Sequence, residues 1–102
     1  MIEIMTIGDV IKTPKGIAIG GKFSSSNEAQ PLEKSLEDMS EKTKNMNFIV
    51  YRDKNGNYSK ILIKDSQFTT SVRDTINLFF LLGDITLPEE IKEGTIIYSA
   101  EK

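Results

Sequence analysis

Residues 75–84, Thr75-Ile76-Asn77-Leu78-Phe79-Phe80-Leu81-Leu82-Gly83-Asp84, form the stretch that decides the fold. Its second half is apolar at consecutive positions, a pattern typical of a strand that is buried or covered on both faces. Residues 85–94 follow as an acidic connector that ends in glycine, and residues 95–98, Thr95-Ile96-Ile97-Tyr98, predict a second strand because they are mostly β-branched. This order of strand, connector and returning strand indicates a small β-barrel.

The amino-terminal part predicts two further strands joined by a tight turn. Residues 2–13 are rich in β-branched side chains, and Gly8-Asp9 interrupts them in a way that predicts a bulge or a bend. Thr13-Pro14-Lys15-Gly16 predicts the turn, because proline fixes φ at the second position and glycine permits a positive φ at the fourth. Within the next strand, residues 17–23, Gly20-Gly21 indicates a bulge or the close approach of another backbone.

Asn55-Gly56 predicts a β-hairpin in the middle of the chain, since this pair is preferred in a two-residue type I′ turn. Centring the hairpin there gives three cross-strand pairs: Phe48 with Ile63, Val50 with Ile61, and Arg52 with Ser59. One face then carries Phe48, Val50, Ile61 and Ile63. Tyr51 and Lys60 lie opposite each other on the other face. Residues 65–74 are expected to form an irregular link.

A single helix is expected around residues 31–46, inside a polar insertion that spans residues 24–46. Pro31 suits the first helical turn, and the apolar side chains behind it recur at helical spacing: Leu32, Leu36, Met39, Thr43 and Met46. A helix with so narrow an apolar stripe is marginal alone and must lie on something. The stripe packs either on this chain's own sheet or on a partner or second copy. The candidate partner-binding residues are Leu32, Leu36, Met39 and Met46.

The composition indicates one globular domain over residues 1–102 and removes several kinds of chemistry. Of its 102 residues, 27% are charged and 38% are hydrophobic, which is typical of a folded chain. The chain has neither cysteine nor histidine, so it cannot form disulfides, a thiolate nucleophile, a Ser-His-Asp triad or the common zinc sites. Its net charge of -2 argues against a broadly basic nucleic-acid binder. No segment approaches the roughly 20 apolar residues that cross a bilayer, and the acidic start does not resemble a signal peptide, so we expect a cytoplasmic protein without membrane contact.

Three motifs suggest ligand sites, but each is better explained as structure. Residues 16–22 nearly match a phosphate-binding loop, yet Phe23 stands where the hydroxyl that holds magnesium belongs. Residues 53–64 hint at a calcium loop, but Tyr58 and Lys64 occupy the positions that require glycine and glutamate. The acidic group Glu89, Glu90 and Glu93 has no identifiable acid–base partner. We therefore predict no catalytic, cofactor-binding or metal-binding residue.

The predicted hairpin brings an aromatic side chain close to several cations. The candidate nucleic-acid residues are Tyr51, Arg52, Lys60 and Lys64. Aromatic rings beside cations can stack on bases while the cations contact phosphates. An ordinary solvated hairpin face is the alternative interpretation.

Two segments of the chain resemble the second domain of elongation factor Tu and of related translation GTPases. Residues 7–23 are similar to the opening of that domain: an acidic residue and a valine, a turn that contains glycine, and a β-branched run into Gly-Lys. Residues 77–97 are similar to its close, with an aliphatic run, a short loop, an acidic-Ile-x-x-Gly motif and a strand. The resemblance covers about half the chain, and residues 24–46 depart from it as an inserted loop and helix.

The resemblance implies a mainly β fold: a closed antiparallel barrel of six to seven strands with one inserted helix. In the translation factors this barrel follows a GTPase domain and helps to bind tRNA or the ribosome, whereas here we expect it as a stand-alone domain. Because no set of nucleophile, base and orienting group can be assembled, we expect a non-enzymatic binding module whose partner is a protein or a second copy. The alternative is an RNA- or ribosome-associated accessory protein. A small enzyme that uses carboxylate or hydroxyl chemistry is the least favoured reading.

Overall fold

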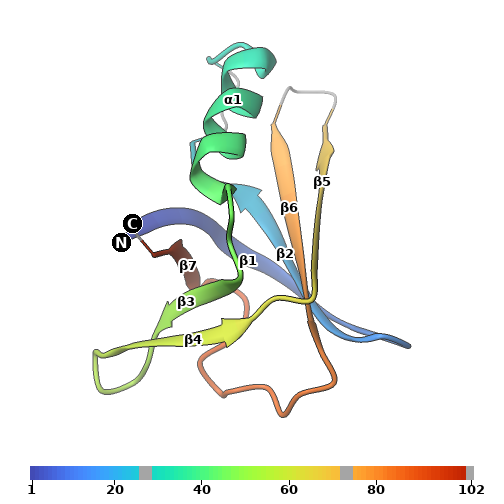
Figure 1. The fold of residues 1–102 in the computed structure, drawn as a ribbon, viewed down its shortest axis with the longest axis vertical. Helices are drawn as coiled ribbons and strands as arrows, with labels where there is room; N and C mark the ends of the chain where they lie inside the picture. Colours follow the sequence, from blue (N-terminus) through green and yellow to red (C-terminus); the bar gives the residue numbers. More distant parts are fainter. Residues whose placement is uncertain (26–28, 72–74, 101–102) are drawn as a thin grey trace.

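One antiparallel sheet runs through the computed structural model, which describes residues 1–25, 29–71 and 75–100. The elements along the chain are β1 (Ile2–Thr13), β2 (Gly16–Phe23), α1 (Leu32–Thr43), β3 (Phe48–Arg52), β4 (Tyr58–Leu62), β5 (Asp65–Thr70), β6 (Ile76–Gly83) and β7 (Ile96–Ser99). The seven described strands follow the spatial order β4-β3-β7-β1-β2-β6-β5 (Figure 1). The predicted mainly β class with one helix is confirmed.

The strands nearest the two ends of the chain are neighbours. β1 pairs antiparallel with β7, where Ile2 lies opposite Ser99, and Figure 1 shows β7 beside β1. On its other side β1 pairs with β2 through the turn after Thr13. The register of β1 and β2 shifts between Ile7 and Asp9, which confirms the bulge predicted at Gly8-Asp9.

Gly20 and Gly21 let β2 lie close to both of its neighbours. A Cβ atom on Gly21 would stand 1.9 Å from the backbone oxygen of Thr6 on β1. A Cβ atom on Gly20 would stand 2.6 Å from the ring of Phe79 on β6. The predicted close approach of another backbone is therefore confirmed at Gly21, where no side chain fits.

The β3–β4 hairpin forms around Asn55-Gly56, but its predicted register is wrong by one residue. The observed pairs include Phe48 with Leu62, Val50 with Lys60, and Arg52 with Tyr58. The turn has three residues instead of two, since the Gly56 N–H donates to the Asp53 carbonyl at 3.0 Å and Gly56 has a φ of 81°.

The Asp53 carboxylate explains why the longer turn forms. Its Oδ1 atom accepts hydrogen bonds from the backbone N–H groups of Asn55 and Asn57, at 2.9 and 3.0 Å. A shift of one residue between paired strands moves every side chain of one strand to the other face. Tyr51 therefore lies opposite Ser59, and Lys60 belongs to the other face of the hairpin.

Residues 65–70 form a regular strand where an irregular link was expected. β5 pairs with β6 from Asp65 opposite Leu81 to Thr70 opposite Ile76. All six of its residues are exposed, and Phe68 is the one apolar residue among them. The expected link was wrong because an exposed edge strand needs no alternating apolar pattern. Residues 72–74 of that link lie outside the described residues.

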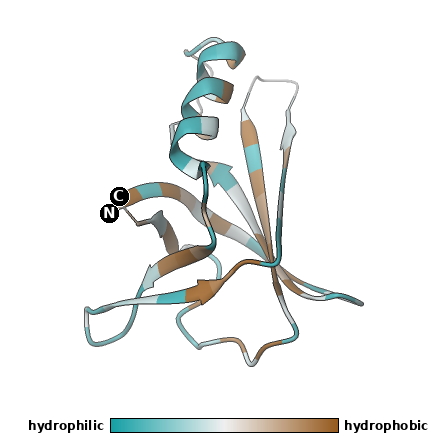
Figure 2. Ribbon diagram, viewed as in Figure 1, coloured by the Kyte–Doolittle hydropathy of each residue, from teal (hydrophilic) through white to brown (hydrophobic). Residues whose placement is uncertain are grey.

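The helix is shorter than expected and stands at one end of the sheet, beside β2 and β6 (Figure 1). Pro31 precedes the helix with a ψ of 140°, and its carbonyl accepts the N–H groups of Lys34 and Ser35. The helix ends at Thr43, and Asn45 has a φ of 60°. In Figure 2 most of α1 is hydrophilic with separate apolar bands, whereas β6 is largely apolar.

The core lies where side chains of both halves of the sheet meet. Its buried members include Ile4, Ile7, Ile19, Phe23, Ile49, Ile76, Leu78, Phe80, Leu82, Ile91 and Ile97. In the described chain β4 and β5 stand at opposite ends of the strand order, and no pairing between these two strands closes the sheet. Residues 63 and 64, which link β4 to β5, form hydrogen bonds on opposite sides of the chain. The Ile63 N–H donates to the Asn47 carbonyl at 2.9 Å, and the Lys64 N–H donates to the Leu81 carbonyl at 2.8 Å.

Candidate functional site

The outer face of β3, β4 and β7 gathers aromatic and basic side chains. Alternate residues of a strand point to opposite faces, and β3 pairs with β7 through Val50 and Tyr98. The register therefore places seven side chains on this outer face: Phe48, Val50, Arg52, Tyr58, Lys60, Leu62 and Tyr98. We call these seven residues the hairpin face.

Contacts between rings and cations organise the hairpin face. Lys60 Nζ lies 4.7 Å from the centre of the Phe48 ring, and Arg52 Cζ lies 5.8 Å from the centre of the Tyr58 ring. The Tyr58 and Tyr98 rings meet edge to face, with their centres 5.6 Å apart and their planes at 86°. These distances are typical of cation–π and aromatic pairs. Each cation of the hairpin face thus rests on an aromatic ring.

Two large apolar side chains of the hairpin face are open to solvent. Tyr58 is 49% exposed and Leu62 is 72% exposed. A single exposed apolar residue is ordinary, but these two flank Lys60 on one five-residue strand. Neither β3 nor β4 contains an acidic residue, although the chain has a net charge of -2. The hairpin face is therefore an apolar and cationic surface on an acidic protein.

The four nucleic-acid candidates do not lie together. Arg52 and Lys60 belong to the hairpin face and are exposed, and Lys64 is exposed beyond the end of β4. Tyr51 is buried with 7% exposure and belongs to the core, so it cannot stack on a base. That part of the prediction is wrong because it used the two-residue turn, which put Tyr51 and Lys60 on one face.

Three rings of the hairpin face were not predicted from the sequence: Phe48 and Tyr58, which lie beside Lys60 and Arg52, and Tyr98, which lies against Tyr58. Phe48 and Tyr58 belong to the two strands that the predicted turn joins. Asp53 was the available signal, since an aspartate at that position can accept the turn's N–H groups and favour a longer loop. The three-residue turn would have placed Tyr58 opposite Arg52 on the outer face.

The helical partner-binding candidates lie against the chain's own core. Met39 is 5% exposed and belongs to the core, and three partly buried side chains of the same stripe pack against it: Leu32, Leu36 and Met46. Ser35, beside them, is fully buried, and its hydroxyl accepts a 2.8 Å hydrogen bond from Gln30 Nε2. Most of the apolar surface of the stripe is thus used within the chain.

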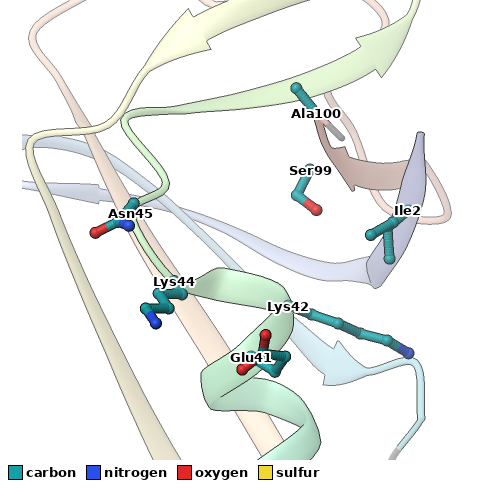
Figure 3. Close-up of a pocket in the computed structure, with 7 residues that line it drawn as sticks. All are labelled: Ile2, Glu41, Lys42, Lys44, Asn45, Ser99 and Ala100. Carbon is teal, nitrogen blue, oxygen red and sulfur yellow. The ribbon is translucent and has the colours of Figure 1, made fainter. Parts of the chain in front are cut away.

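A cavity of about 490 Å³ lies between the end of α1 and the paired ends of β1 and β7 (Figure 3). It is lined by Ile2, Glu41, Lys42, Lys44, Asn45, Ser99 and Ala100. Lys42 and Lys44 extend to opposite sides of the helix end in Figure 3. Lys42 Nζ donates to Ser25 Oγ at 2.7 Å and pairs with Asp38 at 3.3 Å.

The acidic connector between β6 and β7 ties the hairpin to the sheet. Glu90 Oε2 accepts the backbone N–H of Lys54 at 3.2 Å, while Glu89 and Glu93 are exposed. Among residues 1–25, 29–71 and 75–100, no cluster of three or more potential ligands could hold a metal ion. Within the same residues, no helix has the length and apolar character needed to cross a membrane.

A scan against models of known protein families, a search of curated proteins and a search of solved structures each returned no match. The likeness to the second domain of the translation factors therefore rests on the two sequence segments that carry it.

Proposed function

We propose that this chain is a non-enzymatic binding module whose partner docks on the hairpin face. The observation that carries the proposal is the exposed row Tyr58, Lys60 and Leu62 on β4, which continues into the rings of Phe48 and Tyr98. Aromatic side chains and arginine are enriched at the centres of binding interfaces, where they supply most of the binding energy. The cations favour a partner with a negative potential, because complementary charge raises the association rate and selects the partner.

Two single substitutions of equally exposed aromatic residues test this proposal. Tyr58 on the hairpin face and Phe68 on β5 are both 49% exposed. A partner isolated from the native cell should bind Tyr58→Ala at least about tenfold more weakly than the parent chain, as expected for an interface anchor. It should bind Phe68→Ala as tightly as the parent. Equal affinity for both variants would place the docking surface elsewhere.

We also propose that the sheet closes into the barrel that the resemblance to the translation factors implies. The hydrogen bonds of Ile63 and Lys64 support closure, because the Ile63 N–H donates toward β3 and the Lys64 N–H donates toward β6. Consecutive N–H groups of one continuous strand point to opposite sides in this way. A single bent strand made of β4 and β5 would then join β3 to β6 and complete a ring. Closure would remove strand edges at the bend and hold the hairpin face on a rigid frame. Amide exchange tests closure: Ile63 and Lys64 should exchange as slowly as the central strands, and exchange at the rate of exposed turns would refute it.

Single-stranded RNA is a second candidate partner, which the placement of Arg52 and Lys60 over aromatic rings favours. Proteins bind single strands by stacking bases on rings while cations contact the phosphates. Fluorescence anisotropy with a single-stranded RNA should then show binding at low salt that weakens as salt is added, by a log–log slope of about -0.7 for each phosphate neutralised. The Lys60→Glu variant should lose this binding. No binding at low salt, or binding that ignores salt, would exclude RNA.

A further inference from the structure

β4 has a free backbone edge whose geometry follows from two hydrogen bonds. In an antiparallel pair, residues alternate between bonding to the neighbouring strand and pointing away from it. Asp53 N–H donates to the Asn57 carbonyl at 2.7 Å, and Ile63 N–H donates to the Asn47 carbonyl at 2.9 Å. Positions 57, 59, 61 and 63 therefore face β3. The N–H and C=O groups of positions 58, 60 and 62 face away from it, and no described strand pairs with that edge.

The three residues with outward backbone groups are also those with the open side chains. Tyr58, Lys60 and Leu62 are all exposed, and all belong to the hairpin face. Sheet edges of this kind are ready templates for pairing with another chain unless charge, proline or a bulge protects them. β4 has no proline and an unbroken register with β3, and its one charge, Lys60, repels a basic strand but attracts an acidic one. An incoming strand would therefore meet backbone groups, two apolar side chains and one cation.

We infer that the free edge of β4 accepts an extended acidic segment of a partner protein as an added strand. The inference rests on the proposed function, because the added strand would extend the hairpin face. A residue of the partner opposite Lys60 would be acidic, and the residues two positions to either side, opposite Tyr58 and Leu62, would be apolar. Cross-strand pairs of opposite charge and of apolar side chains stabilise neighbouring strands. The partner segment therefore has the pattern apolar-x-acidic-x-apolar.

Charge argues for an acidic partner over a second copy. β4 carries Lys60 at its centre, the neighbouring β3 carries Arg52, and neither strand has an acidic residue, so an acidic strand is complementary to the charge of this edge. Pairing of β4 with itself about Lys60 would place two ammonium groups opposite each other, which destabilises a strand pair. The other sheet edge, β5, lacks cations and has Asp65 at its start. The acidic segment is thus expected at β4 and not at β5.

Two blocked peptides provide the probe: Thr-Val-Thr-Glu-Thr-Val-Thr and the same peptide with lysine in place of glutamate. Each is titrated into the full ¹⁵N-labelled chain to about millimolar concentration, the range in which weak affinities are measurable. The glutamate peptide should shift the amide signals of Tyr58, Lys60 and Leu62 most and slow their hydrogen exchange. The lysine peptide should bind at least about tenfold more weakly. Shifts confined to β5, or equal binding of both peptides, would overturn the inference.

Two variants of Leu62 separate the backbone edge from the side chain. Leu62→Pro removes an outward N–H without removing a bond to β3, and edge strands tolerate proline at such positions. Leu62→Ala removes the side chain and keeps the N–H, so it should bind the glutamate peptide at least about fivefold more tightly than Leu62→Pro does, with similar melting temperatures. Equal binding by the two variants would overturn the added strand.

Lys60→Glu provides a second test in case Leu62→Pro does not fold. This exposed substitution should reverse the preference, so that the lysine peptide binds more tightly than the glutamate peptide. An unchanged preference would contradict the inference. A partner or a single-stranded RNA that requires Tyr58 but binds Leu62→Pro and Leu62→Ala equally would overturn the added strand and leave the hairpin face as the docking surface. The proposed function itself would be refuted by a partner that binds Tyr58→Ala as tightly as the parent chain.

Discussion

Gly21→Ala tests the closest backbone contact of the sheet. The new Cβ atom would lie 1.9 Å from the Thr6 oxygen and 2.9 Å from the Thr6 carbonyl carbon. Both atoms belong to the backbone of β1 and cannot rotate away. Restoring an ordinary van der Waals distance requires β1 and β2 to separate by more than about 1 Å, which disrupts native packing between well-packed elements. The substitution therefore acts on the sheet itself and not on one side chain.

The expected loss of stability follows from the bonds and side chains at that point. Separation weakens about two ladder hydrogen bonds, each worth about 1 kcal/mol. It also loosens the packing of buried Ile4 and Ile7. The total loss in the free energy of unfolding is then about 3 kcal/mol, which is within the range that overpacking of a core costs. For a domain of this size, that loss lowers the melting temperature by about 10–20 °C.

Gly8→Ala is the matched control for this experiment. A Cβ atom on Gly8 would meet its nearest atom, the Gly20 oxygen, at 3.8 Å, an ordinary contact. Thermal and urea unfolding followed by circular dichroism should show Gly8→Ala close to the parent chain and Gly21→Ala strongly destabilised. If both variants unfold at the same temperature, the close approach of β1 to β2 is not a constraint on the fold and the reasoning fails.

Two further predictions concern the helix and the turn. Met39→Ala should lower the free energy of unfolding by about 2–4 kcal/mol, because Met39 is 5% exposed and its truncation leaves a cavity. The control is Glu37→Ala at an exposed position of the same helix, which should change the free energy of unfolding in urea by less than about 0.5 kcal/mol. A small effect of Met39→Ala would contradict the packing of α1 on the core. Asp53→Ala should cost about 1 kcal/mol in the same assay, because it removes the acceptor for the N–H groups of Asn55 and Asn57. Asp53→Asn, which keeps an acceptor oxygen, should recover most of that loss. An Asp53→Ala variant as stable as the parent chain would show that this acceptor does not stabilise the turn.

The elements predicted best are those whose side chains alternate or whose backbone is constrained by glycine. β2 and β6 were placed within the chain by their apolar runs, and both lie beside each other in the sheet. The bulge at Gly8 and the close approach at Gly21 were visible because glycine has few other reasons to interrupt a strand. The short helix was found from its apolar spacing, although its end was set at Met46 and not at Thr43.

The hairpin face could not be predicted because its composition depends on the register of β3 and β4. Asn55-Gly56 favours a two-residue turn by its own preference, and the hydrogen bonds of Asp53 decide for three residues. The one extra residue in the turn shifts the register by one position and so exchanges the inner and outer faces of one strand of the hairpin. Edge strand β5 was missed for a different reason, since a strand exposed on every residue has no hydrophobic period to detect.

β7 links the two parts of the sheet, and this has a consequence for synthesis of the chain. β3 reaches the remaining strands through β7 alone among the described pairings, and β7 is made after the six other described strands. While Ile96–Ser99 is still inside the ribosomal tunnel, the emerged chain can assemble only a β3–β4 hairpin and a separate sheet of β1, β2, β5 and β6. Pairings between strands that are distant in the sequence slow folding and leave aggregation-prone intermediates. A released chain that stops before residue 96 should therefore bind chaperones, and a chain that includes β7 should not.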